Sequence, residues 1–150
     1  MDPERAQLLA VPDHGLLLLY DGVCGLCNGL VRFLIKRDRG DRYRFATLQS
    51  ELGRQLVRGH GYDPDVISTV YVLSRPGLPA EKVWRRGRAA VIAIAGVGRG
   101  WSLFHGLRIL PSFLLDFGYG LVARRRYRLF GKLDSCPAPE PGQRHKFLAH

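Results

Sequence analysis

Two cysteines and an aspartate within seven residues carry the clearest chemical signal in the sequence. Asp21, Cys24 and Cys27 form the pattern Asp-x-x-Cys-x-x-Cys. Residues three apart on a helix have Cβ atoms about 5–6 Å apart, whereas a disulfide needs roughly 3.5–4.5 Å. A slight tightening of the first helical turn closes this gap, so the cysteine pair could form and break a disulfide with little backbone movement. We therefore expect redox chemistry at this pair.

The sequence on either side of this motif predicts a strand followed by a helix. Leu16–Tyr20 is a short apolar run typical of a buried strand, and residues 24–37 carry apolar side chains at helical spacing. Cys24 would then lie at the helix N-terminus, where free N–H groups and the helix dipole favour a thiolate. The dipole contributes about 0.3–1 kcal/mol, or ~2 kcal/mol when partly buried, and therefore lowers the Cys24 pKa by only about one unit. No basic residue lies within the motif, so we expect a mildly activated thiol of the reducing type.

The three motif residues are predicted to have different roles. Cys24 is expected to be the nucleophile, and Cys27, one turn further along the helix, the resolving thiol. Asp21 has two interpretations of equal weight. An Asp-Gly pair after a strand is ordinary turn chemistry, or a partly buried Asp21 carboxylate moves the proton of Cys27 during exchange. An ionised Asp21 close by would oppose thiolate formation.

The residues around the motif resemble a known family. Tyr20 to Asn28, with the sequence YDGVCGLCN, is similar to the signature of the DCC family, which is regarded as a family of thiol-disulfide oxidoreductases with a thioredoxin-like fold. The resemblance extends over roughly residues 16–148. It is carried by residues 45–50, 110–111, 126–131, 136–137 and 146–148. The resemblance implies a thiol-disulfide oxidoreductase whose substrates are poorly defined.

The remaining elements follow the order of a thioredoxin core. Further strands are predicted at residues 43–47, 68–73 and 81–84. Further helices are predicted after a Ser50 cap, with Gly59 or Gly61 as the stop, and at residues 88–96. This order predicts an α/β fold with a four-stranded mixed sheet, which combines a parallel βαβ unit with an antiparallel hairpin and is flanked by helices. We expect residues 1–15 to form a flexible leader. Residues 16–150 would form a single thioredoxin-like domain that includes a helical C-terminal extension from about residue 98.

Two positions depart from the patterns that the resemblance suggests. Thioredoxins carry a cis-proline just before the third strand, beside the active site. Here that place falls near residues 67–69, and the nearest proline, Pro64, is several residues too early. The DCC pattern often has a serine two residues before the third-helix alanine, where this chain has Gly87. The substrate-docking edge built around the proline is therefore not expected in the same form.

Apolar side chains are frequent in the predicted extension. Residues 101–109 are predicted to form a short helix, and Pro111 suits the first turn of another. The expected packing face of that second helix consists of Phe113, Leu114, Phe117 and Leu121. We interpret these side chains as core packing rather than as a cofactor site.

The formal net charge of +10 is carried largely by arginine. Most arginines are spread along the chain, which favours solvated helix faces over a nucleic-acid partner or a membrane surface. The dense run from Arg124 to Arg128 is the one place where we would look for an anionic partner.

The cysteines also allow a metal-binding interpretation. Cys24 and Cys27 could form half of a zinc site that Cys136 and His145 complete, although the spacing of the second pair is unusual. Haem attachment requires a histidine after the second cysteine, where this chain has Asn28. Three roles remain open for Cys136: a buried packing thiol, a second resolving thiol or a metal ligand.

These observations combine into one hypothesis and one alternative. With no signal-peptide pattern and no apolar run of roughly 18–20 residues, we expect a cytoplasmic protein without a membrane span. The hypothesis is an oxidoreductase that acts on a disulfide-containing substrate, takes electrons from a dithiol donor, and uses neither a cofactor nor a metal. The alternative is a non-catalytic binding module on the same scaffold, which holds zinc through its cysteines or an anionic partner through the run from Arg124 to Arg128.

Overall fold

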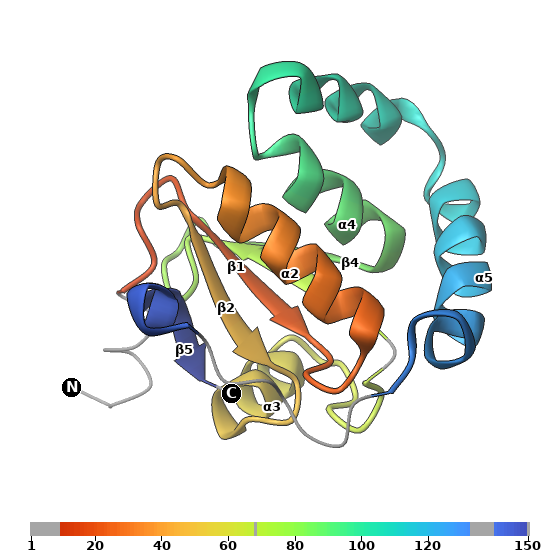
Figure 1. Cartoon of the computed structure of the whole chain (residues 1–150), viewed down its shortest axis with the longest axis horizontal. Coiled ribbons are helices and arrows are strands. Elements are labelled where there is room, and N and C mark those ends of the chain that lie inside the picture. The colour runs from red at the N-terminus through yellow and green to blue at the C-terminus, as the bar shows by residue number, and fades with distance from the viewer. Residues whose placement is uncertain (1–9, 68, 133–139, 150) are drawn as a thin grey trace.

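A five-stranded mixed sheet forms the centre of the computed structural model, which describes residues 10–67, 69–132 and 140–149 (Figure 1). The strand order is β4-β3-β1-β2-β5. β1 pairs with β2 in parallel and with β3 in antiparallel orientation, β3 pairs with β4 antiparallel, and β2 pairs with β5 in parallel. The strands are β1 (Leu16–Tyr20), β2 (Tyr43–Thr47), β3 (Tyr71–Ser74), β4 (Lys82–Arg85) and β5 (Phe147–Ala149).

Helices cover both faces of this sheet, with α2 and α4 on one face and α3 on the other (Figure 1). Because successive strand residues point to opposite faces, Leu18 and Tyr20 of β1 join the core beneath α2, while Leu17 and Leu19 join the core beneath α3. The helical elements are α2 (Gly25–Arg37), α3 (Glu51–Gly59), α4 (Arg86–Ala95), the 3₁₀ segment η1 (Arg99–Ile109), α5 (Ser112–Phe130) and the short 3₁₀ segment η2 (Pro141–Lys146).

The predicted α/β class with a thioredoxin-like mixed sheet is confirmed, but the strand count was one too low. The fifth strand, β5, is only three residues long and pairs with the outer edge of β2. Its ring contact between Phe147 and Phe45, with centroids 5.4 Å apart, fixes the end of the chain on the sheet. A pattern of three residues is too short to predict a strand.

The described part of the leader contacts the sheet. Val11 is buried in the core on the α3 side, and Arg42 donates hydrogen bonds from Nε and Nη2 to the His14 carbonyl at 3.1 and 3.0 Å. The division of the chain into a leader and a single domain stays a prediction.

The helical extension is present, but its expected packing face was wrong. Phe113, Leu114 and Phe117 are 69%, 48% and 67% exposed, and Leu121 is exposed as well. Instead, α5 packs against α2 and α4 through the opposite stripe, which includes Tyr119 and Arg126. The sequence pattern identified the apolar residues of α5, but it could not show which of its two apolar sides would meet the core.

Within the described residues, no single helix has the length and hydropathy of a membrane span. The segments Leu103–Ile109 and Ser112–Phe130 together reach that length and hydropathy, with a bend of 113° between them.

Candidate active site

Cys24 caps the N-terminus of α2, as the strand-turn-helix pattern predicted. Its backbone is extended, and its sulfur accepts a hydrogen bond from the Cys27 backbone N–H at 3.4 Å. This is the position at which a side-chain acceptor satisfies a free N–H of the first helical turn. Cys24 and Cys27 are both free thiols, with exposed fractions of 0% and 5%. The two sulfurs are therefore close together and buried.

The turn that carries the cysteines is held by two amide side chains. The buried Asn28 donates from Nδ2 to the carbonyls of Gly22 and Cys24, at 2.8 and 2.9 Å. Gln49, which follows β2, accepts the Gly22 N–H at 3.1 Å. Sequence reasoning gave neither amide a role. Both residues lie in stretches that carry the family resemblance, and that resemblance was the sequence signal that could have identified them.

Asp21 makes the turn contact of the first interpretation, and its side chain is buried, as the second interpretation required. Its Oδ1 accepts the Val23 N–H at 3.1 Å, which is ordinary turn chemistry, and the Gln49 amide at 2.7 Å. Its Oδ2 accepts the Tyr127 hydroxyl and forms an ion pair with Arg126 at 3.1 Å. Asp21 is therefore a fully buried carboxylate. The hydrogen bonds described for its side chain involve neither sulfur, so its role in moving the proton of Cys27 stays a prediction.

Arg126 brings a positive charge to the motif from the far end of the chain. It lies on α5, is 5% exposed, and also donates hydrogen bonds to the Tyr127 hydroxyl at 2.9 Å and the Ile67 carbonyl at 3.3 Å. The arginine run is therefore not one uniform basic surface. Arg124, Arg125 and Arg128 are exposed, whereas Arg126 belongs to the site. Reasoning within the motif alone could not find this residue.

The two thiols differ strongly in acidity. The pKa of Cys24 is lowered to about 6, mainly by a hydrogen bond that the Cys27 thiol donates to it. Backbone N–H groups and the charge of Arg126 contribute to this lowering, whereas burial opposes it. The same hydrogen bond raises the pKa of Cys27 well above its usual range, together with burial and the negative charge of Cys24. The proton of the pair therefore resides on Cys27. The activation exceeds the mild effect expected from the helix dipole because Cys27 and Arg126 add to it.

A later segment of the chain covers Cys24. Residues 130–132 cross the start of α2, where Gly25 donates its N–H to the Gly131 carbonyl at 3.2 Å and Cys24 forms an antiparallel bridge with Lys132. A Cβ atom on Gly25 would lie only 2.1 Å from the Phe130 carbonyl oxygen. Glycine is therefore required at position 25 for this crossing.

A cavity of about 420 Å³ reaches Cys27 from the other side. It lies between α2, α4 and α5 and is almost entirely apolar, with Cys27 and Arg126 in its lining. Gly87 forms part of the wall, where a Cβ atom would approach the Leu115 carbonyl oxygen to 2.4 Å. The departure from the family pattern at Gly87 therefore has a structural reason: glycine lets α5 pack closely against α4.

Where a thioredoxin would carry its cis-proline, α5 contacts the backbone. The Val70 N–H donates to the Tyr119 hydroxyl at 2.9 Å, and the Ile67 carbonyl accepts from Arg126. No cis peptide bond occurs in the part of the chain that the structure describes. Ser68 lies outside the described residues. The edge beside the cysteines is thus occupied by side chains of this chain.

The zinc alternative gains no support from the described residues, which contain no group of three or more His, Cys, Asp or Glu side chains that could hold a metal. His145, one of the proposed ligands, pairs instead with Asp41, with 3.0 Å between Nε2 and Oδ1. Cys136 lies outside the described residues.

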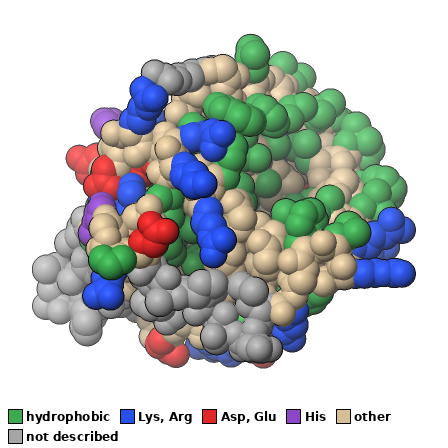
Figure 2. Space-filling model, viewed as in Figure 1, with side chains coloured by type: hydrophobic (Ala, Val, Ile, Leu, Met, Phe, Trp, Pro, Cys, Tyr) green, Lys and Arg blue, Asp and Glu red, His purple; other side chains and the backbone are tan. Residues whose placement is uncertain are grey.

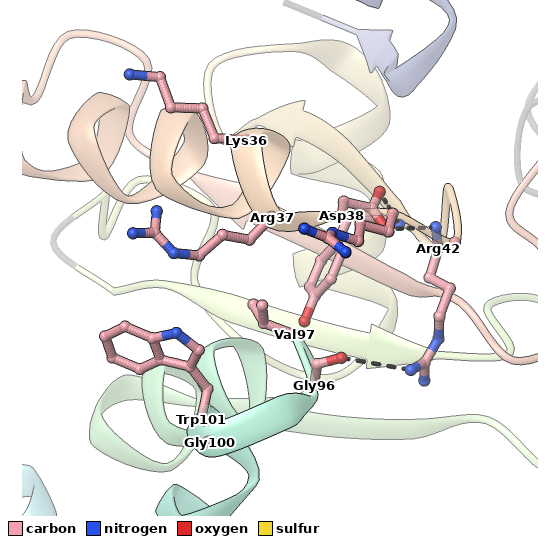
Figure 3. Close-up of a pocket in the computed structure, with 11 residues that line it drawn as sticks. Lys36, Arg37, Asp38, Arg42, Gly96, Val97, Gly100 and Trp101 are labelled. Carbon is pink, nitrogen blue, oxygen red and sulfur yellow. Dashed lines mark hydrogen bonds between the residues drawn. The ribbon is translucent and has the colours of Figure 1, made fainter.

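A second hollow lies at the opposite end of α2 from the cysteines (Figure 3). It has a volume of about 390 Å³, and Lys36, Arg37 and Trp101 are among its lining residues. Two of its polar side chains already bind backbone groups in its wall: Arg42 donates from Nη1 to the Gly96 carbonyl at 3.3 Å, and Asp38 accepts the Arg42 backbone N–H at 2.8 Å. The hollow contains no cysteine, so it has no direct part in thiol chemistry.

Comparisons with known proteins agree with the geometry of the cysteine site. The family model described as DCC1-like thiol-disulfide oxidoreductase matches residues 18–132. The uncharacterized protein YuxK of Bacillus subtilis is 36% identical over 132 residues, which cover 88% of this chain and 93% of YuxK. The chloroplastic DCC family protein At1g52590 of Arabidopsis thaliana is 37% identical over 126 residues, which cover 83% of this chain and 70% of the plant protein. No solved structure gives a significant match. The chain belongs to the DCC1-like thiol-disulfide oxidoreductase family.

Proposed function

We propose that the protein reduces disulfide bonds, with Cys24 as the nucleophile and Cys27 as the resolving thiol. The observation that carries the proposal is the arrangement of the pair. The sulfur of Cys24 accepts hydrogen bonds at the start of α2 beside a buried arginine, and the proton resides on Cys27. This arrangement supports a thiolate at Cys24 and an exchange step within the pair.

The proposed reaction has two displacement steps. The Cys24 thiolate attacks one sulfur of the substrate disulfide, and the departing thiolate takes a proton from solvent. Cys27 then gives up its proton and attacks the sulfur of Cys24. The second substrate thiolate leaves and takes that proton. The substrate gains two electrons and two protons, and the protein is left with a Cys24–Cys27 disulfide.

The surrounding residues stabilise the charged form of Cys24. Arg126 places a positive charge near both sulfurs, and Asp21 fixes the position of that arginine by a buried ion pair. In this proposal Asp21 acts through Arg126 as a positioning residue. Transfer of the Cys27 proton through Asp21 is the further role to be tested.

No cofactor is needed in this proposal, because the cysteine pair carries both electrons. The pair is returned to the dithiol form by an external dithiol or thiol donor. Because Cys24 has no exposed surface, residues 130–132 must move before a substrate sulfur can reach it. The reaction rate therefore includes an opening step.

The test is turnover of a disulfide-bonded peptide with dithiothreitol as the external reductant. Wild type should accelerate reduction, and Cys24→Ser should not. Cys27→Ala should stop after the first step and accumulate a mixed disulfide between Cys24 and the peptide, which intact-mass spectrometry detects. Equal rates for wild type and Cys24→Ser would refute the proposal.

A further inference from the structure

The outer side of η1 and α5 carries a large exposed apolar surface. Leu103 and Ile109 are 82% and 88% exposed, and Phe113 and Phe117 add two aromatic rings. We call this surface the η1–α5 face; its exposed apolar residues are Leu103, Leu107, Ile109, Leu110, Phe113, Leu114, Phe117, Leu121 and Val122. Figure 2 shows hydrophobic side chains gathered over this side of the molecule. A contiguous apolar surface of this kind indicates an interaction site, whereas isolated exposed apolar residues do not.

The charges around this face are predominantly positive. Residues 99–130 contain six arginines and a single carboxylate, Asp116, which lies 3.9 Å from the guanidinium of Arg86. Arg108, Arg124, Arg125 and Arg128 are exposed. Figure 2 shows Lys and Arg side chains along the borders of the apolar area. The partner therefore has to combine an apolar interior with negative charges at its edge.

The order of residues along α5 matches such a partner. Phe113, Phe117 and Leu121 follow one another at intervals of four residues and lie on one side of the helix. The same stripe continues into Arg124 and Arg128. The exposed stripe is thus apolar at the bend between η1 and α5 and basic at the far end of α5. An amphipathic surface with arginines beside an apolar area is typical of binding at the interface of an anionic bilayer.

We propose that the η1–α5 face docks on an anionic lipid bilayer, with the bend around residues 109–113 inserted among the acyl chains and the arginines at the headgroups. The bend belongs to the two segments that together have the length and hydropathy of a span but are turned by 113°. That geometry suits insertion from one side of the membrane. A second copy of this chain is the poorer occupant, because a symmetric contact would set the two arginine borders against each other.

Docking in this orientation would bring the redox pair close to the membrane surface. Leu114 and Val122 belong both to the η1–α5 face and to the lining of the cavity that reaches Cys27. The mouth of that cavity therefore opens on the docking face. The proposal does not depend on the activity of the cysteines, so Cys24→Ser is expected to dock as wild type does.

Sedimentation with lipid vesicles tests the proposal directly. The wild-type chain should partition onto phosphatidylcholine vesicles that contain phosphatidylglycerol, and much less onto pure phosphatidylcholine. Partitioning onto the anionic vesicles should fall as salt is raised, because salt screens the arginines. Absence of binding to the anionic vesicles, or equal binding to both, would overturn the proposal.

Matched double variants separate the face from general hydrophobicity. Phe113→Ser with Phe117→Ser should lower the partition coefficient by roughly tenfold or more, because two exposed rings no longer enter the lipid. Val66→Ser with Leu78→Ser, which removes two exposed apolar side chains outside the face, should change it by less than about twofold. Arg124→Gln with Arg125→Gln should weaken the salt dependence of binding.

Equal losses of binding for the two serine pairs would contradict the proposal. So would a concentration-dependent dimer that Phe113→Ser with Phe117→Ser abolishes, since that result assigns the face to a second copy.

Discussion

Two carboxylate clusters tie the C-terminal part of the chain to the sheet, and they differ in what surrounds them. In the first, Asp21 before α2 holds Arg126 of α5, and both side chains are buried. In the second, Asp38 and Asp41 after α2 share Lys146 of η2, whose Nζ lies 2.6 Å from an oxygen of each. Each cluster joins residues that are more than a hundred positions apart in the sequence.

The second cluster contains one buried and one open carboxylate. The side chains of Asp38 and Lys146 are 2% and 9% exposed. Asp41 is half exposed and also contacts Arg44 and His145, at 3.2 and 3.0 Å. The hydrogen bond from Lys146 lowers the pKa of Asp41 far below its usual range, and His145 and Arg44 add to this. Several cations and water share the charge of Asp41, so this carboxylate does not depend on any one of them.

Position explains why only the first cluster can act on the thiols. Both clusters contain a buried ion pair, in which the loss of one partner leaves the other charged and unsolvated. Arg126 also lies close enough to the sulfurs to lower their pKa. None of the hydrogen bonds described for the second cluster involves a cysteine. This cluster holds η2 and β5 against β2.

The largest expected effect is the loss of the buried arginine. Arg126→Met leaves Asp21 uncompensated and should lower the free energy of unfolding by about 3–5 kcal/mol. Arg124→Met on the same helix replaces an exposed arginine and should stay within about 0.5 kcal/mol of wild type. Denaturant unfolding measures both variants, and similar losses would remove the distinction drawn between them.

The second prediction concerns the acidity of Cys24. Its thiolate fraction should rise with pH through a midpoint near 6. Cys27→Ala removes the hydrogen bond that contributes most and should raise the midpoint by at least about one unit, which is ~1.4 kcal/mol. Ultraviolet absorbance of the thiolate follows the titration, and Cys24→Ser should lack this step.

The control variant for this titration changes Asp41, in the second carboxylate cluster. Asp41→Asn should leave the Cys24 midpoint unchanged, because Asp41 is not among the groups that set it. A shift as large as that of Cys27→Ala would show that the two clusters are coupled.

The third prediction tests the segment that covers Cys24. Gly25→Ala places a methyl group against the Phe130 carbonyl and should cost about 1–3 kcal/mol of stability, while alkylation of Cys24 becomes faster. Gly29→Ala on the same helix meets no atom within 4 Å and should instead stabilise by up to about 1 kcal/mol. If both variants leave Cys24 equally protected from alkylation, residues 130–132 do not control access.

The smallest effect is expected at Asp41, the open carboxylate of the second cluster. Asp41→Asn should lower the free energy of unfolding by no more than about 1 kcal/mol near neutral pH, because Asp41 is half exposed. The folded-state pKa of Asp41 lies below its ordinary value, so the stabilisation is complete above about pH 4 and is lost as the pH falls further. Unfolding measured at neutral and acidic pH should therefore show the two proteins converging in acid.

Local patterns predicted most of the sheet and the placement of the cysteines. Leu16–Tyr20 and Tyr43–Thr47 were predicted at their observed bounds. The first is an apolar run, and the second is buried along its whole length although it contains Arg44. Ser50 caps α3 as expected, with its Oγ accepting the Gly53 N–H at 3.1 Å. The strand-turn-helix order alone located Cys24 at the start of α2.

Features that depend on contacts across the whole chain could not be predicted. Nothing in the spacing of the arginine run distinguishes Arg126, which is buried, from Arg125, which is exposed. Helical periodicity predicted that Phe113 and Phe117 would pack inward, but burial depends on which elements lie opposite, and none of the described elements covers these two rings. Both failures concern α5, whose position is set by close approaches at Gly25 and Gly87.

The distance along the chain between Cys24 and Arg126 has a consequence for biosynthesis. A ribosome that makes the protein completes both cysteines about a hundred residues before it adds the arginine. Until α5 has been made and has packed beside α2, the thiols lack the positive charge that favours a thiolate. Nascent chains and C-terminally truncated fragments should therefore hold less of Cys24 as the thiolate at a given pH, while they also lack the residues that cover it. Activation and covering of Cys24 are thus acquired together, when the C-terminal part of the chain folds.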